Sequence, residues 1–195
     1  QRHRVARRLT PDQTQEWRPV VSRDGKRVWF VSDRDGAGRI FELDVETGET
    51  RRVTRISEAT VPYALAPDGE SLVCAAARDG DLPERCWRAA LVSPDGSEKI
   101  LAGDAMALEP EISPDGKRLA FTWREDSIYR KRRGSRSSKE PEIWICGLED
   151  GSFSRLETDA WSACSPRWRP DGKALYYLGR GKGESVASVR EYVFP

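Results

Sequence analysis

The chain is poor in the residue that most often performs proton transfer in enzymes. Among 195 residues there is one histidine, His3, close to the first residue. A Ser/His/Asp or Cys/His arrangement needs a histidine that is held on a fixed scaffold by a third group. We place His3 in a ragged N-terminal strand, where such support is missing, so we expect no catalytic residue of this type.

Cysteine is also scarce, and its spacing is uninformative for metals. The four cysteines, Cys74, Cys86, Cys146 and Cys164, form no CxxC pair. Metal-ligand spacing is therefore absent, and we expect no metal site. We interpret these cysteines as small buried side chains. A cross-strand disulfide between Cys74 and Cys86 is the alternative, although adjacent strands rarely offer its geometry.

Three further features that the sequence lacks exclude particular classes of partner and ligand. The net charge is +1, from 33 basic and 32 acidic residues, so the chain has no overall attraction for nucleic acid. No apolar run approaches the roughly 18 residues that span a membrane. No glycine-rich phosphate loop opens a helix. We therefore expect no nucleic-acid partner, no membrane insertion and no cofactor.

A short phrase centred on Asp-Gly occurs four times and defines the organisation of the chain. Its aspartates are Asp24, Asp68, Asp115 and Asp171, at intervals of 44, 47 and 56 residues. Proline presets the first turn position and glycine accepts the left-handed one, so each phrase predicts a tight hairpin in which the aspartate is structural. Strand-rich repeats with this period predict the blades of a β-propeller.

Apolar residues alternate on both sides of each turn, which predicts strands with one buried face. A third strand is expected at 39–44, 85–90 and 142–146, and a short fourth strand at 51–54, 99–102 and 154–157. Each repeat is then a four-stranded antiparallel meander, and the fold class is all-β.

The two ends of the chain suggest how the propeller is completed. Residues 7–10 match the fourth strand at 51–54, whereas the chain closes at a third strand, 190–194. In one interpretation the N-terminal strand completes the last blade and hides its edge. We then expect one domain, 1–195, with blades at about 17–54, 61–102, 108–157 and 165–195 plus 1–10. In the other, the chain is part of a larger propeller, and an incomplete ring would self-associate.

The repeats resemble those of the TolB-like β-propeller family. The resemblance rests on the Ser-Pro-Asp-Gly-Lys phrases, on 32–36 after the second strand, and on 43–44 with 47–48 at the second turn. It covers almost the whole chain and implies a bacterial propeller, with a periplasmic or cell-envelope location if it carries over. Two features depart from the family: the family usually has more than the four blades counted here, and Arg23 replaces the turn proline in the first phrase.

The second half is also similar to the propeller of the prolyl-oligopeptidase family, through 143–145 and 165–172. That resemblance implies a propeller that controls access to a separate hydrolase domain, and no such domain is present in these residues.

The interval of 56 residues contains a strongly basic insertion in the third blade. A charged run of this kind is usually a solvated loop. The functional alternative is a clamp for an anionic partner, made by Arg130, Lys131, Arg132, Arg133 and Arg136. Connections at the same end of the ring add Arg34, Arg78, Arg124 and Arg180, and loops on a rigid scaffold often carry binding sites.

Three tryptophans are expected at strand ends near the same face. Trp17, Trp123 and Trp161 either pack between blades or anchor a bound peptide, since Trp and Arg dominate interface hot spots. Trp29, Trp87, Trp144 and Trp168 stand mid-strand and are expected in the core.

Together these observations favour a non-catalytic scaffold that binds a protein or peptide, with an anionic ligand as one option. The first alternative is the propeller portion of a prolyl-oligopeptidase-like peptidase whose catalytic domain lies elsewhere. The second is an enzyme that uses carboxylates in the central channel.

Overall fold

The computed structural model describes residues 6–10, 13–36, 38–55, 59–78, 86–103, 105–123 and 140–195. These residues form four antiparallel sheets and contain no helix. The first sheet holds β1 (Glu16–Val21), β2 (Arg27–Ser32), β3 (Arg39–Asp44) and β4 (Thr50–Arg52). The second holds β5 (Thr60–Leu65), β6 (Leu72–Arg78), β7 (Cys86–Val92) and β8 (Glu98–Ile100).

The third sheet holds β9 (Leu108–Ile112), β10 (Arg118–Trp123), β11 (Glu142–Gly147) and β12 (Phe153–Arg155). The fourth holds β13 (Ser162–Trp168), β14 (Ala174–Arg180) and β15 (Ser188–Val193). Strand order follows chain order in every sheet. The expected all-β propeller class is therefore confirmed, and the first three sheets are four-stranded meanders.

The Asp-Gly phrases form the β-turns that the sequence predicts. Gly25, for example, has a φ of 73°, in the left-handed region that glycine enters without steric cost. Asp24 accepts hydrogen bonds from the Ser22 hydroxyl and the Lys26 backbone amide. These bonds lower the pKa of Asp24, so its carboxylate stabilises the turn in the charged form.

Apolar side chains fill the spaces between neighbouring sheets. Between the second and third sheets, Val73 and Ala89 pack against Leu119 and Phe121, and all four are at most 1% exposed. Similar clusters join the first sheet to the second and the third to the fourth. The strand alternation predicted from the sequence thus places one face of each sheet against its neighbour.

The register of β6 and β7 bears on the cysteines. Cys74 lies opposite Ala90, whereas Cys86 lies opposite Arg78, four positions further along the ladder. The disulfide alternative is therefore wrong, and Cys74 is a buried thiol, as the favoured interpretation predicts.

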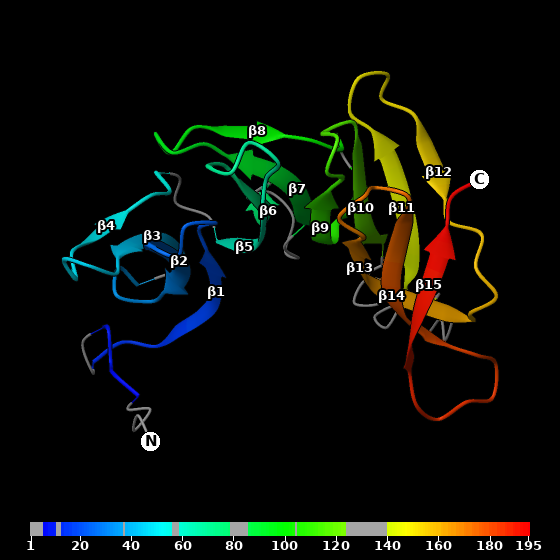
Figure 1. Cartoon of the computed structure of the whole chain (residues 1–195), viewed down its shortest axis with the longest axis horizontal. Coiled ribbons are helices and arrows are strands. Elements are labelled where there is room, and N and C mark those ends of the chain that lie inside the picture. Colours follow the sequence, from blue (N-terminus) through cyan, green and yellow to red (C-terminus); the bar gives the residue numbers. More distant parts are fainter. Residues whose placement is uncertain are drawn as a thin grey trace, which may run out of the picture.

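The four sheets follow one another along an open arch, with the first and fourth sheets at its two ends (Figure 1). Residues 7–10 form no strand. Instead, Arg7 donates a hydrogen bond to the Val45 carbonyl, and Leu9 lies against the first sheet. The expectation that the N-terminal strand completes the last blade is wrong, because the arch holds the first and fourth sheets apart. The fourth sheet has three strands in the described part of the chain.

Candidate functional site

The first strand of each sheet, β1, β5, β9 or β13, lies on the inner side of the arch (Figure 1). Each of these strands has a β-bulge at the same place in the repeat. Arg18, Glu109 and Ser165 occupy this position with φ values of 56°, 52° and 55°. Each precedes a proline, and the second sheet has Pro62 there. Bulges redirect side chains and often stand beside functional sites.

The left-handed backbone at these bulges is unusual for residues other than glycine. Such a conformation costs about 1–3 kcal/mol and persists only where surrounding contacts enforce it. Arg18, Glu109 and Ser165 make contacts with the neighbouring sheets that stabilise this backbone conformation. The same contacts bring the polar side chains of the inner strands together.

Between the first and second sheets, the contact is aromatic. The Arg18 guanidinium lies 4.6 Å from the centroid of the Tyr63 ring, so a cation–π contact joins β1 to β5. Burial raises the pKa of the Tyr63 phenol, and the positive charge of Arg18 opposes that shift. Tyr63 therefore stays a neutral hydrogen-bond donor at physiological pH.

Between the third and fourth sheets, the contacts are made by carboxylates. Glu109 accepts hydrogen bonds from the Thr122 hydroxyl at 2.8 Å and from the Ser165 backbone amide at 2.9 Å. Glu111 accepts one from the Trp168 backbone amide at 3.2 Å and pairs with Arg167 at 3.6 Å. Both acids therefore hold β9 against β13.

These five residues, Arg18, Tyr63, Glu109, Glu111 and Arg167, are called the inner wall below. Glu109 and Arg167 both lie close enough to Tyr63 to act on its pKa. Arg18 is exposed, and the Arg167 side chain is 45% exposed. The inner wall thus presents two accessible guanidinium groups around a phenol, which suits oxygen acceptors such as peptide carbonyls and carboxylates.

Glu111 gives the inner wall a defined pH dependence. Burial raises the pKa of Glu111, and Arg167 opposes the shift only partly. The folded state then binds a proton more tightly than the unfolded state, so this residue lowers stability as pH rises through its raised pKa. In urea titrations from about pH 4 to pH 7, the stability of Glu111→Gln relative to the native chain should increase with rising pH, because the variant lacks the carboxyl whose ionisation is disfavoured by burial. Parallel stability curves would contradict this assignment.

Arg34, predicted as a partner contact, is engaged within the first sheet. Its guanidinium pairs with Glu16 at 2.5 Å, donates to the Ser32 hydroxyl at 3.0 Å, and lies 4.5 Å from the Phe41 ring centroid. The side chain is 18% exposed. The structure thus gives Arg34 a role in holding the first sheet together.

Arg180, the last residue of β14, and Trp161, directly before β13, lie together at one end of these two paired strands. The Arg180 guanidinium lies 5.1 Å from the Trp161 ring and pairs with Glu140 at 3.1 Å. Trp161 is 51% exposed and lines a cavity of about 550 Å³ between the third and fourth sheets. Of the predicted aromatic anchors, it is the one with an adjacent hollow of ligand size.

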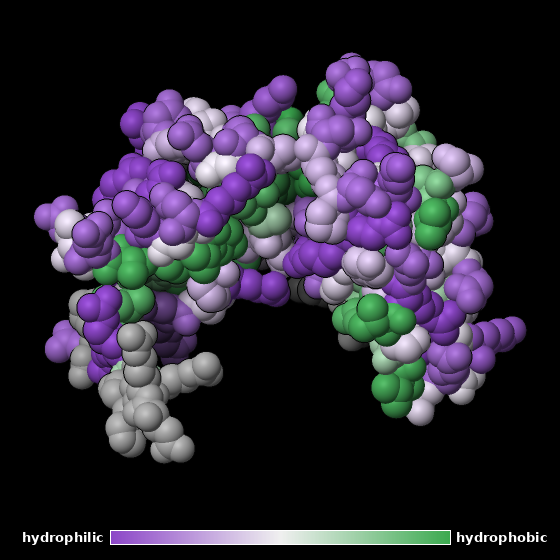
Figure 2. Space-filling view, viewed as in Figure 1, coloured by the Kyte–Doolittle hydropathy of each residue, from purple (hydrophilic) through white to green (hydrophobic). Residues whose placement is uncertain are grey.

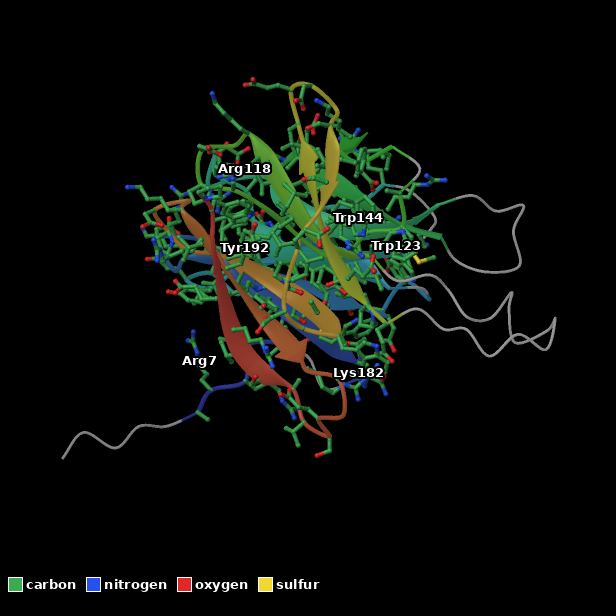
Figure 3. The ribbon with its side chains drawn as sticks, turned by 90° about the vertical axis from the view of Figure 1, so that its right-hand side faces the viewer. Arg7, Arg118, Trp123, Trp144, Lys182 and Tyr192 are labelled. Atoms are coloured by element: carbon green, nitrogen blue, oxygen red, sulfur yellow. The ribbon has the colours of Figure 1, made fainter. Side chains whose placement is uncertain are left out.

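The other two predicted anchors differ from each other. Trp123 packs beside Trp144, with 6.4 Å between the ring centroids (Figure 3). This contact agrees with a packing role for Trp123 and not with a role as a peptide anchor. Trp17 is 39% exposed and lines a smaller groove on the first sheet. Arg124 and the basic insertion, Arg130, Lys131, Arg132, Arg133 and Arg136, lie outside the described residues, as do His3 and the side chain of Arg78.

The mid-strand tryptophans are mostly in the core, as predicted. Trp29 is 2% exposed and Trp168 is 6% exposed, while Trp87 and Trp144 are partly buried.

Two negative findings apply to the parts of the chain that the structure describes. No group of three histidine, cysteine or acidic residues there has an arrangement that could hold a metal ion. Nor do these parts include a helix with the length and apolar character needed to cross a bilayer.

None of the five inner-wall residues is among the site residues predicted from the sequence. One pattern could have pointed to them: Arg18, Glu109 and Ser165 all stand directly before a proline at the same place in the repeat. A polar residue that recurs there on the innermost strand of a meander would face the channel side of the arch.

Comparison with known proteins gives the family context. The family described as the tricorn protease N-terminal beta propeller domain matches residues 1–185. A tricorn protease homolog of Streptomyces coelicolor is 27% identical over 194 residues, which cover 94% of this chain and 17% of that protein. The uncharacterized peptidase YuxL of Bacillus subtilis is 27% identical over 161 residues, or 82% of this chain and 21% of that protein.

Among solved structures, TolB from Acinetobacter baumannii superposes with a TM-score of 0.68 at 20% identity, covering 95% of this chain and 42% of that one. The fold expected from the TolB-like resemblance is therefore confirmed. The chain spans about a fifth of the length of the two curated relatives above.

Proposed function

Because the chain belongs to the family of tricorn protease N-terminal β-propeller domains, we propose that it is a non-catalytic module that binds polypeptide for a peptidase-type protein. The proposal joins the two leading interpretations of the sequence, a binding scaffold and the propeller portion of a peptidase. The observation that carries it is the inner wall, where Arg18 on β1 and Arg167 on β13 present accessible guanidinium groups at the two ends of the row of inner strands.

The chemistry of the inner wall favours an extended, acidic polypeptide. A peptide in extended form exposes a carbonyl at every residue, and the Tyr63 phenol and both guanidinium groups are hydrogen-bond donors. Charge-assisted hydrogen bonds from arginine to carboxylate are about twice as strong as neutral ones. Acidic side chains or a C-terminal carboxylate would therefore bind here better than basic ones.

The same contacts argue against catalysis by the inner wall. General acid–base catalysis needs a carboxylate within reach of the substrate proton. Glu109 is occupied by Thr122 and Ser165, and Glu111 by Trp168 and Arg167. In both acids it is the Oε2 oxygen that makes these contacts and ties the third sheet to the fourth, which supports a positioning role for the two carboxylates.

The test is a titration of three fluorescein-labelled, unstructured peptides of matched length, one acidic, one neutral and one basic, followed by anisotropy. We expect the acidic peptide to bind most tightly. Losing one charge-assisted hydrogen bond costs about 1.5–3 kcal/mol, so Arg18→Ala and Arg167→Ala should each weaken its binding by about tenfold or more. The matched control is Arg155→Ala, because Arg155 is 48% exposed but lies on β12, at the outer edge.

A second variant separates the inner wall from the basic insertion. Replacing Arg130, Lys131, Arg132 and Arg133 by serine should slow association at low salt if the insertion contacts the peptide, since charge mainly raises association rates. If this variant loses binding while Arg18→Ala and Arg167→Ala do not, the inner-wall site is wrong. Cleavage of any peptide by the purified chain, detected by mass spectrometry, would refute the non-catalytic role.

A further inference from the structure

The cavity between the third and fourth sheets has the size and lining of a second ligand site. Its volume of about 550 Å³ lies in the usual range of ligand pockets, about 300–1,000 Å³. Part of its lining is apolar and includes the buried side chains of Ile143 and Leu156. The cavity is distinct from the hollow of the arch that Figure 2 shows, because none of the five inner-wall residues lines it. A ligand in this cavity would therefore bind apart from the inner wall.

The indole ring of Trp161 is accessible from this cavity. Trp161 lines the cavity and is half exposed, although tryptophan is on average a highly buried residue. The Arg180 guanidinium lies 5.1 Å from the ring centroid, but Arg180 does not line the cavity. Arg180 therefore approaches the ring from outside the cavity, and the part of the ring that borders the cavity is open to a ligand.

The charged lining of the cavity is acidic. Among the described residues it consists of Glu140, Glu142, Arg155 and Glu157, with a formal charge of −2. Arg155 pairs with Glu142 at 3.3 Å and with Glu157 at 3.0 Å. Glu140 pairs through its Oε2 with Arg180 at 3.1 Å, while its Oε1 accepts no hydrogen bond from the part of the chain that the structure describes. The cavity thus combines an open aromatic ring with a carboxylate that has a free acceptor oxygen.

A second cavity shows that the repeat does not dictate this acidic lining. Arg52 and Arg155 hold the same place in the repeat, since each lies opposite an aromatic residue of the third strand. The cavity beside Arg52 has a volume of about 420 Å³, and its charged lining is Arg51, Arg52, Arg55 and Asp95, with a formal charge of +2. The same part of the repeat therefore borders cavities of opposite charge, and the acidic lining is particular to the cavity between the third and fourth sheets.

We propose that this acidic cavity binds the side chain of an arginine residue in a polypeptide partner. A planar guanidinium group stacks on an aromatic ring and pairs with a carboxylate through two parallel hydrogen bonds, which an ammonium group cannot do. The aliphatic stem of the arginine would lie against the apolar lining, which includes Ile143 and Leu156. This site is separate from the inner wall, and the chemistry of its ligand goes beyond the proposed function.

Calorimetric titration of the full chain with two short peptides tests the charge requirement. The probes are acetyl-Gly-Arg-Gly-amide and the same peptide with citrulline in place of arginine. Citrulline has nearly the shape of arginine but no charge, so the arginine peptide should bind about tenfold more tightly or better, because only it makes charge-assisted hydrogen bonds. Equal affinities would overturn the proposal, as would no binding of the arginine peptide at about 10 mM.

Two variants test the location of the site. Trp161→Ala should weaken binding of the arginine peptide by about tenfold through loss of the cation–π contact, and Glu140→Gln by about tenfold or more through loss of the charged acceptor. Trp161 is half exposed, and glutamine can still accept the hydrogen bond from Arg180, so both variants should fold. The matched controls are Trp17→Ala and Glu149→Gln, which change exposed residues of the same types outside the cavity and should bind like the native chain.

The acidic cavity and the inner wall can be shown wrong independently. Arg18→Ala should leave binding of the arginine peptide unchanged, and Trp161→Ala should leave binding of the acidic peptide unchanged. If Trp161→Ala and Glu140→Gln bind the arginine peptide as tightly as the native chain does, the acidic cavity is not its site and the proposal fails. That result would leave the assignment of the acidic peptide to the inner wall as it stands.

Discussion

Replacing Phe121 by alanine is expected to lower the free energy of unfolding by about 3–5 kcal/mol, the usual cost of removing a large buried aromatic side chain. Phe121 is 1% exposed and lies in the cluster between the second and third sheets. Its loss leaves a cavity where rigid strands on both sides limit collapse. Urea unfolding, followed by tryptophan fluorescence, measures the change.

Phe153 provides the matched control for this prediction. Its ring contacts the Phe121 ring edge-on at 6.4 Å between centroids, but Phe153 is 46% exposed. Phe153→Ala should therefore cost only about 1 kcal/mol, mostly from the lost aromatic pair. Equal losses in the two variants would mean that the space between the second and third sheets is not the tightly packed core described here.

Gly96→Ala is expected to be the most damaging single-methyl change in the described part of the chain. Gly96 has a φ of 83°, and an added Cβ would also clash with the backbone carbonyl oxygen of Val53. The backbone conformation alone costs about 1–2 kcal/mol for an alanine. The clash adds to this, because the connection between the first and second sheets has to shift.

Gly48→Ala separates the two contributions. Gly48 has a φ of 77°, but nothing lies within 4 Å of a Cβ built there. It should show the backbone cost alone, so we expect Gly96→Ala to lose at least about 1 kcal/mol more, as overpacking typically does. Thermal and urea unfolding of the two variants measure this difference. A smaller loss in Gly96→Ala would show that the connection moves easily.

The repeat made the blades predictable, because turn chemistry and strand alternation are local. Ser22, Asp24 and Gly25 make their turn with residues no more than five positions apart. The match between residues 7–10 and 51–54 was also meaningful: Leu9 lies against the first sheet as Val53 packs against the second. The sequence could not show which sheet the segment contacts, since that depends on how far the arch turns.

The inner wall was harder to predict, since it breaks a local rule. A residue before proline normally adopts an extended conformation, yet Arg18, Glu109 and Ser165 are left-handed. Their conformation is enforced by contacts with the neighbouring sheet, which no local pattern encodes. Arg34 shows the opposite case: a recurring loop arginine suggested a binding surface, but an acid and an aromatic ring nearby in the same sheet engage its side chain.

The open arch also determines the order in which the four sheets unfold. Each sheet contacts only its neighbours, so stability is nearly a sum of nearest-neighbour terms, as in a one-dimensional array. The two middle sheets are supported on both faces and the two end sheets on one. Local unfolding therefore begins in the first and fourth sheets and spreads to the two middle ones. Backbone amides of β6 and β10 should exchange their hydrogens more slowly than those of β2 and β14. A partner that covered the exposed faces of the end sheets would remove this difference in local stability. The four sheets would then unfold together as one cooperative unit.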